Sequence, residues 1–166
     1  MADVYIIGSY STRFQKWPDK SFKDLTREAY LGVLDDSGLD NGDEIEIAYF
    51  GNCGLGTFGQ PCIRGQVCFT PLVQEGLFPE RVPTVNVEDA CATSSVAMNG
   101  AWKDILSGQS HLAIAMGVEK TYVPDDPAAT MELFAGGIDQ LDPEVWQTHY
   151  REQGEAMGKP FETGPG

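Results

Sequence analysis

The sequence predicts a layered α/β protein, with a mostly parallel sheet and helices on both of its faces. Strand-like and helix-like segments alternate through the first 122 residues. The strand-like run at residues 111–118 is almost continuously apolar, as in a strand that is covered on both faces. A βαβαβ order of this kind joins parallel strands through right-handed crossovers. Ligands of such sheets gather at the carboxyl ends of the strands.

The elements at the start of the chain are a strand and a helix. Residues 4–10 are β-prone and are expected to form the first strand. Ser21 is a helix N-cap, with Asp24 three residues further on as an imperfect capping box, and Gly38 is a helix stop. The buried face of this helix is expected to hold Leu25, Ala29, Gly32 and Val33.

A second strand and a glycine-rich loop follow. Ile45, Ile47 and Tyr49 alternate with Glu46 and Ala48, as in a strand with one wetter face. Residues 51–61 hold four glycines and a proline, which predicts a loop. Residues 65–76 are expected to form the next helix.

A third strand is expected at residues 82–87, and a third helix at residues 93–107 with Gly108 at its end. The packed side of that helix is expected to hold Val96, Ala97, Gly100, Ala101 and Ile105. After Tyr122 prolines and glycines interrupt the pattern, with short helices at 128–134 and 144–153. We therefore expect an α/β domain over residues 1–122, and over 123–166 the incomplete start of an irregular loop domain.

Composition excludes several classes of function. Lys and Arg total 11 against 25 Asp and Glu, a net charge of −14, and no basic cluster appears, so nucleic acid is not an expected partner. No run approaches the roughly 18 apolar residues of a membrane span. The amino terminus has no basic flank before its apolar run, unlike a signal peptide. The expected location is the cytoplasm, without a membrane partner.

Three of the four cysteines have an ordinary explanation. Cys53, Cys62 and Cys68 are expected to be small buried apolar residues. The cysteines form no C-x-x-C pair and have no matching histidine cluster, so no zinc site or other metal site is expected.

Cys91 differs because it stands between a strand and a helix. Ala92 and the small residues behind it open that helix. Backbone N–H groups at a helix start lower the pKa of a thiol from about 8.5 and can hold an oxyanion. Cys91 is therefore the candidate nucleophile. Glu88 and Asp89 oppose this role if they face the thiol, because their charges raise its pKa.

Several segments carry a family resemblance. The strand at 85–87, Ala90-Cys91, the helix ending at Ser107-Gly108 and Gly117-Val118-Glu119 resemble the nucleophile region of the thiolase superfamily. Residues 4–14 resemble the opening strand of that family, and Gly51-Asn52 with Gly59-Gln60 and Arg64 resembles its glycine-rich loop. The chain is thus similar to the amino-terminal half of a thiolase of the sterol-carrier-protein and archaeal branch.

The resemblance implies an acyl-CoA C-acyltransferase that forms an acyl-Cys91 intermediate. Coenzyme A enters as part of the substrate, no cofactor is expected to be bound, and residues that contact coenzyme A stay unassigned. The general-base histidine and the second catalytic cysteine of the family belong to a half that this chain lacks. His111 and His149 match no family motif position and are expected to be ordinary structural or surface residues. The chain is therefore expected to be catalytically incomplete by itself.

Two alternatives remain open at this stage. Ala90-Cys91-Ala92-Thr93-Ser94 fits a β-ketoacyl synthase equally well. The chain also fits a non-catalytic thiolase-like subunit of a complex. The resemblance further implies a homodimer or higher oligomer, and allows a small zinc-ribbon/OB-fold partner subunit.

Overall fold

The computed structural model describes residues 3–124 and 126–159. The chain divides into two compact units, with the boundary between Tyr122 and Val123. Each unit is described by itself.

The first unit is built on a parallel sheet. In the described residues its strands are β1 (Ile47–Gly51), β2 (Thr84–Val87) and β3 (Ala113–Gly117), in the order β2-β1-β3. Gly51 is the register partner of both Val87 and Gly117, so the three carboxyl ends are level. The predicted α/β class and the parallel sheet are confirmed, and the segments that follow the strands begin at one edge.

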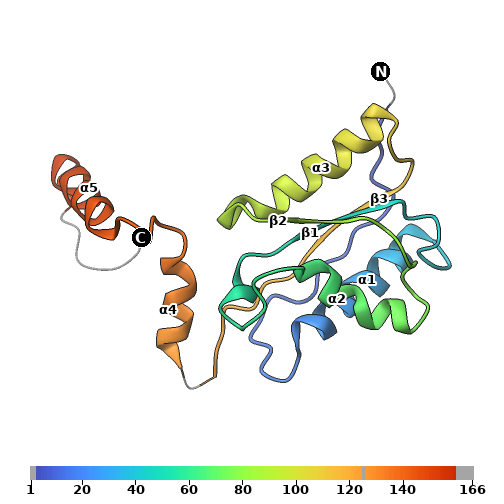
Figure 1. Cartoon of the computed structure of the whole chain (residues 1–166), viewed down its shortest axis with the longest axis horizontal. Coiled ribbons are helices and arrows are strands. Elements are labelled where there is room, and N and C mark those ends of the chain that lie inside the picture. Colours follow the sequence, from blue (N-terminus) through green and yellow to red (C-terminus); the bar gives the residue numbers. More distant parts are fainter. Residues whose placement is uncertain (1–2, 125, 160–166) are drawn as a thin grey trace. The chain divides into compact units, whose positions relative to one another are not determined.

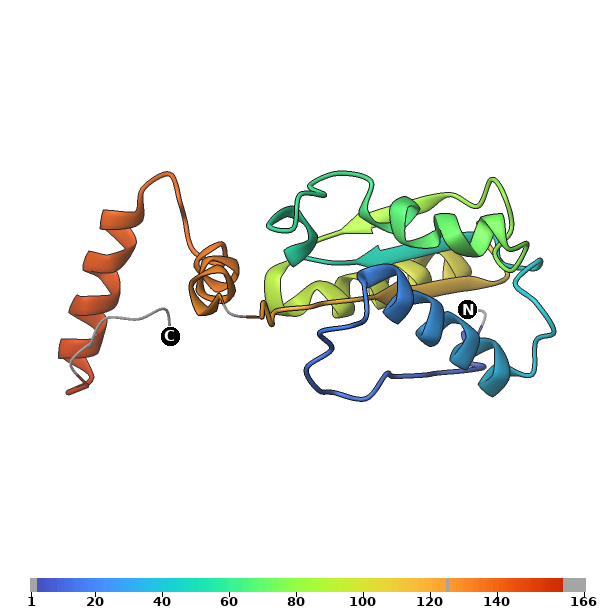
Figure 2. The same ribbon diagram turned by 90° about the horizontal axis from the view of Figure 1, so that it is seen from below.

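Helices cover both faces of this sheet. They are α1 (Phe22–Ser37), α2 (Arg64–Gln74) and α3 (Thr93–Ser107). Helix α3 lies on one face, and α1 and α2 lie on the other (Figure 1). Figure 2 looks onto α1 and α2, which pack side by side. In the described residues of the first unit, α1, α2 and α3 lie close to the three segments that were predicted to be helical.

The central strand β1 has one buried face and one half-buried face, but the buried face is the one that was predicted to be wetter, while Ile47 and Tyr49 are half-buried. Ala48 and Phe50 are both fully buried. Phe50 fits against Gly65 of α2, and on the other face Tyr49 fits against Gly100 of α3. A Cβ at Gly100 would come within 2.3 Å of the Tyr49 ring. The side chains of β1 therefore alternate as predicted, but the more buried face is the one that holds Ala48 and Phe50, against which α2 packs.

Helix α1 has the predicted ends but a different buried face. The Ser21 hydroxyl accepts from the Asp24 N–H, the Asp24 carboxylate accepts from the Ser21 N–H, and Gly38 closes the helix at φ 72°. Of the predicted stripe only Leu25 is buried, while Ala29, Gly32 and Val33 are half-buried. The buried side chains beside Leu25 are Thr26, Tyr30 and Leu34. The stripe is rotated because α1 packs mainly on α2, with Tyr30 reaching the Leu77 carbonyl at 2.8 Å.

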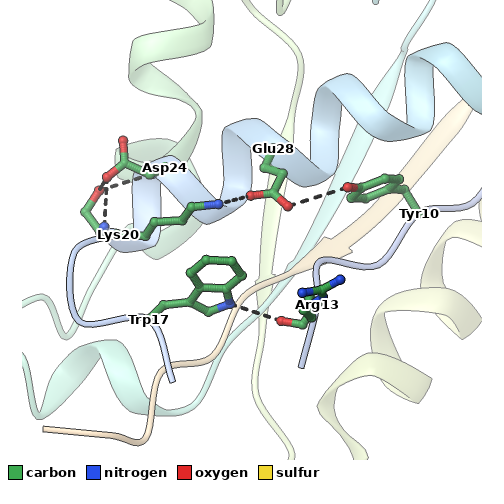
Figure 3. A network of polar contacts seen from close by, with 7 residues as sticks. Tyr10, Arg13, Trp17, Lys20, Asp24 and Glu28 are labelled. Carbon is green, nitrogen blue, oxygen red and sulfur yellow. Dashed lines mark hydrogen bonds and ion pairs between the residues drawn. The ribbon is translucent and has the colours of Figure 1, made fainter. Parts of the chain in front are cut away.

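The predicted strand at residues 4–10 does not form. The segment pairs with no described strand, and side chains attach it to α1 instead. The Ser9 N–H donates to Asp36 at 2.8 Å, and the Tyr10 ring lies against Gly32. Figure 3 shows Tyr10 and Lys20 both reaching Glu28 of α1. A β-prone sequence becomes a strand only where another strand offers it a ladder, and within the described residues none does so.

Two predicted surfaces on α3 and β3 are more open than expected. Val96 keeps 37% of its surface exposed, and α3 buries Ala97 and Ala101 as predicted. On β3, Ile114 is buried but Ala115 is exposed, so this strand is not covered on both faces along its whole length. The reason is its place in the sheet, where the described residues give β3 a neighbour on the β1 side alone.

The second unit consists of two helices, α4 (Pro127–Ala135) and α5 (Pro143–Ala156). Both were predicted, and both are longer than expected. Each begins with a proline in its first turn, where a missing N–H costs no hydrogen bond. Neither helix buries a residue.

Candidate active site

Cys91 lies where β2 gives way to α3, at the carboxyl edge of the sheet. A short 3-10 turn, Ala90–Ala92, holds it and α3 follows directly. Its side chain is exposed. The preceding Ala90 has φ 44°, in the left-handed region that residues with a side chain rarely adopt. We call residues 88–93 the elbow, because the chain reverses there and presents Cys91 outward.

Hydrogen bonds within the elbow support this conformation. The Glu88 carboxylate accepts from the Ala90 N–H at 2.6 Å. The Thr93 hydroxyl accepts from the Asp89 N–H at 2.8 Å and donates to the Ala90 carbonyl at 2.7 Å. The Glu88 carboxylate is thus bound to the backbone of the elbow. The Thr93 side chain, only 7% exposed, fixes the turn from below.

The glycine-rich loop after β1 lies beside the elbow. Asn52, 2% exposed, donates from its backbone N–H to the Val87 carbonyl at 3.3 Å and from its amide to the Val118 carbonyl at 2.7 Å. Its side-chain oxygen accepts from the Leu55 N–H at 2.9 Å, and Arg64 donates to its carbonyl. Asn52 therefore ties the ends of all three strands together.

Glu119 holds the same loop from the end of β3. Its carboxylate accepts from the N–H of Cys53 at 2.9 Å and from the N–H of Gly54 at 3.1 and 3.2 Å. It also accepts from the Asn52 amide at 3.3 Å. The Gly-Val-Glu motif, which served as a family marker in the sequence, is thus a structural anchor of this site.

Cys53 joins the loop to the elbow. Its Sγ donates to the Ala90 carbonyl at 3.1 Å and lies 3.1 Å from the Thr93 hydroxyl. Burial raises the pKa of the Cys53 thiol, the Thr93 hydrogen bond lowers it, and Glu88 and Glu119 raise it further. This thiol is therefore held in its neutral, donating form.

The other cysteines divide between core and surface. Cys68 is 1% exposed and packs in the core, as predicted. The prediction was wrong for Cys62, which is exposed, and inexact for Cys53, which is half-buried and hydrogen-bonded. Cys62 lies in the loop before α2.

The two histidines lie in other surroundings. His111 precedes β3, at the amino edge of the sheet, where its ring nitrogen is 3.4 Å from Glu46. Backbone and ring hydrogen bonds from His111 lower the pKa of the Glu46 carboxyl. His149 belongs to α5 of the second unit, with its ring 5.8 Å from that of Trp146. Since the strands are parallel, His111 and Cys91 stand at opposite edges of the sheet.

Two further classes of site were sought in the described part of the chain. It holds no group of three or more His, Cys, Asp or Glu side chains placed to bind a metal ion. None of its helices combines the length and apolar character needed to cross a membrane.

The arrangement suits covalent catalysis by a thiol. Among the described residues no side chain caps the start of α3, which leaves N–H groups of its first turn without a capping side chain next to Cys91. Such groups stabilise a thiolate and the oxyanion formed when a thiol attacks a carbonyl. The supporting residues Asn52, Cys53, Thr93 and Glu119 were not recognised as contacts from sequence. The sequence signal for Asn52 and Glu119 was that the motifs containing them lie at the ends of strands.

The site is thus an exposed cysteine that follows a left-handed turn between a parallel strand and a helix of an α/β domain. The chain belongs to the thiolase family: residues 4–135 match the thiolase N-terminal domain. The family predicted from the motifs is therefore correct.

The similar proteins include two archaeal acetyl-CoA acetyltransferases. That of Methanothermobacter thermautotrophicus is 35% identical over 129 residues, which are 76% of this chain and 32% of the relative. That of Methanocaldococcus jannaschii is 35% identical over 120 residues, 72% of this chain and 29% of the relative. The benzoylsuccinyl-CoA thiolase subunit BbsB of Thauera aromatica is 34% identical over 116 residues, 70% of this chain and 28% of the relative. The chain spans about a third of the length of these curated relatives.

Proposed function

We propose that this chain is the nucleophile-bearing part of a thiolase, an acyl-CoA C-acyltransferase that makes or cleaves a 3-oxoacyl-CoA through an acyl-Cys91 intermediate. The observation that carries the proposal is the exposed thiol of Cys91 on the Ala90 turn, beside the uncapped start of α3. The match to the thiolase N-terminal domain supports it.

The proposed cleavage begins with the thiolate of Cys91. Its sulfur attacks the 3-oxo carbon, and the bond between C2 and C3 breaks. The electron pair of that bond goes to C2, where the neighbouring thioester holds it as an enolate until an acid protonates it. Coenzyme A then attacks the acyl-cysteine, takes the acyl group and releases the Cys91 thiolate. Synthesis is the reverse sequence, in which the carbanion takes the acyl group.

The base and acid are proposed to come from outside this chain. Two carboxylates around the elbow, those of Glu88 and Glu119, are engaged with backbone N–H groups. His111 stands at the opposite edge of the sheet. We therefore propose that the chain is one part of a longer enzyme, or is completed by a second chain, and that it works in the cytoplasm as a homodimer or higher oligomer. A small zinc-ribbon/OB-fold partner fits this proposal.

The proposed substrate is an acyl-CoA. The names of the relatives support this class, since two are acetyl-CoA acetyltransferases and one is a benzoylsuccinyl-CoA thiolase subunit. They also differ in the size of the acyl group that they name. The proposal therefore includes both acetoacetyl-CoA and bulky acyl-CoA substrates.

The test is acylation of Cys91 in the full-length polypeptide. Incubation with acetyl-CoA or acetoacetyl-CoA is expected to leave an acetyl group on the peptide that contains Cys91. Iodoacetamide is expected to modify Cys91 faster than Cys62, which is also exposed, and acetyl-CoA is expected to protect Cys91 alone. Cys62→Ser is the matched control and keeps its activity. Full activity in Cys91→Ser would overturn the proposal and favour a non-catalytic subunit.

A second assay separates the thiolase from a β-ketoacyl synthase. A thiolase is expected to cleave acetoacetyl-CoA when coenzyme A is added, with acetyl-CoA as product. Condensation of the acyl-enzyme only with a carrier-bound malonyl unit, without thiolysis, would indicate the synthase.

A further inference from the structure

Three side chains beneath the elbow form a connected group, which we call the elbow clamp: Cys53, Thr93 and Glu119. We propose that Glu119 is a positioning residue that sets the conformation of the Cys91 elbow, acting through Cys53 and Thr93. The catalytic part of this inference depends on the proposed function of Cys91. The clamp adds a role for Cys53 and Glu119, which lie outside the nucleophile segment itself.

The first link is between Glu119 and the glycine-rich loop. One carboxylate accepts from two successive backbone N–H groups, of Cys53 and Gly54, and from the Asn52 amide. Hydrogen bonds to an ionised acceptor are roughly twice as strong as those between neutral groups. A glycine-rich loop has little stiffness of its own, so this anchor determines where the Cys53 side chain lies.

The second link is between Cys53 and the elbow. The Cys53 Sγ is 3.1 Å from both the Ala90 carbonyl and the Thr93 hydroxyl. It therefore contacts the residue that directly precedes Cys91. Because the thiol stays protonated, it brings a donor and no charge to this contact.

The third link is between Thr93 and the strained turn. Its hydroxyl bridges the Asp89 N–H and the Ala90 carbonyl, on either side of the residue with φ 44°. A residue with a side chain stays in that strained region only when its surroundings fix it. The structure describes no hydrogen bond from the clamp to the Cys91 thiol, so the clamp acts on the thiol through the backbone.

The first experiment compares two glutamates in the full-length enzyme. Glu119→Gln replaces one acceptor oxygen by a donor, which opposes the N–H groups of the loop. We expect kcat to fall about 10- to 100-fold, as for a misplaced catalytic group, with KM nearly unchanged. Glu46→Gln is the matched control, since Glu46 accepts from the His111 N–H at 2.5 Å at the other edge of the sheet. An unchanged kcat in Glu119→Gln, or the same loss in Glu46→Gln, would overturn the inference.

The second experiment tests the hydroxyl of Thr93. Thr93→Val keeps the shape of the side chain and removes the hydrogen bonds of its hydroxyl to Asp89, Ala90 and Cys53, so it is expected to lower kcat to a similar extent. Thr93→Ser keeps the hydroxyl and is expected to retain most of the activity. Equal activity in the two variants would show that packing alone holds the turn.

A third measurement does not depend on acyl transfer. Hydrogen exchange of the amides of residues 89–92 is expected to be faster in Glu119→Gln and unchanged in Glu46→Gln. If the wild type never acylates Cys91, the proposed function fails, and this exchange then decides the structural role of the clamp by itself. Unchanged exchange at the elbow in Glu119→Gln would overturn the clamp even in an active enzyme.

Discussion

The two units of the chain are held together in different ways. Up to Tyr122 the chain has a continuous core around Phe50, Phe69 and Leu72, with helices on both faces of a sheet. In the second unit neither helix buries a residue, and Leu141 remains 93% exposed. Burial of apolar area is the dominant favourable contribution to folding. The candidate site therefore lies on the unit that has a core. The helices of the other unit depend on local features, a proline in each first turn and the Asp126 cap of α4.

The largest expected difference follows from removing one aromatic ring in each unit. Phe50 is fully buried and lies 5.4 Å from the ring of Phe69, so Phe50→Ala is expected to cost about 3–5 kcal/mol of unfolding free energy. Trp146 is 38% exposed, and Trp146→Ala is expected to change that free energy by no more than about 0.5 kcal/mol. Chemical denaturation monitored by near-UV circular dichroism measures both. A comparable loss in Trp146→Ala would show that the second unit contributes to the cooperative core.

A smaller effect is expected where α3 meets β1. Gly100→Ala gains about 1 kcal/mol of helix propensity, but the new Cβ would lie 2.3 Å from the Tyr49 ring. That ring is held by its hydroxyl, which donates to Asp104 at 2.8 Å. Overpacking costs about 1–3 kcal/mol, so the clash with Tyr49 is expected to outweigh the gain in helix propensity. The midpoint of thermal unfolding is therefore expected to fall. A higher midpoint would show that Tyr49 moves aside freely. Tyr49→Leu in the same background is expected to recover part of the loss.

Local features of both units were predicted from the sequence better than the packing of helices and strands within the first unit. Ser21 and Gly38 define the ends of α1 because a cap depends on a few neighbouring residues. The fully buried Ala48 and the unpaired run at residues 4–10 were not predicted, since both depend on which elements lie beside them. In the second unit both predicted helices form, each with a proline in its first turn, which is a local feature of the sequence.

The candidate site shows the same division. Cys91 was found because a strand, a cysteine and small residues are adjacent in the sequence. Thr93 and Glu119 were not recognised as supports, because their partners are distant or on the backbone; Glu119 binds Cys53, 66 positions away. The spacing of residues along the chain does not indicate such contacts. The left-handed turn at Ala90 could not be predicted from the sequence either, because an alanine normally favours a helix.

Removing the N-cap of α1 has an effect that depends on pH. Ser21→Ala is expected to cost about 1 kcal/mol near neutral pH, because α1 belongs to the unit with the core. The hydrogen bonds from Ser21 hold the pKa of Asp24 below its usual value. The ionised Asp24 carboxylate therefore contributes fully to stability above the usual carboxyl pKa of about 3.9. This contribution is lost as pH falls through the lowered pKa of Asp24 in the folded protein. The difference in the free energy of unfolding between wild type and Ser21→Ala is expected to shrink as pH falls from the usual to the lowered pKa. Urea titrations at several pH values check this, and a constant difference would contradict it.

The matching change in the second unit is expected to be the smallest. Asp126 caps α4 by accepting from the Ala129 N–H at 3.1 Å, so Asp126→Ala removes the same kind of bond as Ser21→Ala. Because α4 buries no residue, loss of its cap is expected to fray the first turn without lowering the free energy of unfolding of the first unit. Cα chemical shifts of residues 127–135 report the local loss, and a denaturation curve reports the global one. A shift of the curve as large as that of Ser21→Ala would show that the two units unfold together, and the contrast between them would then be one of burial alone and not of stability.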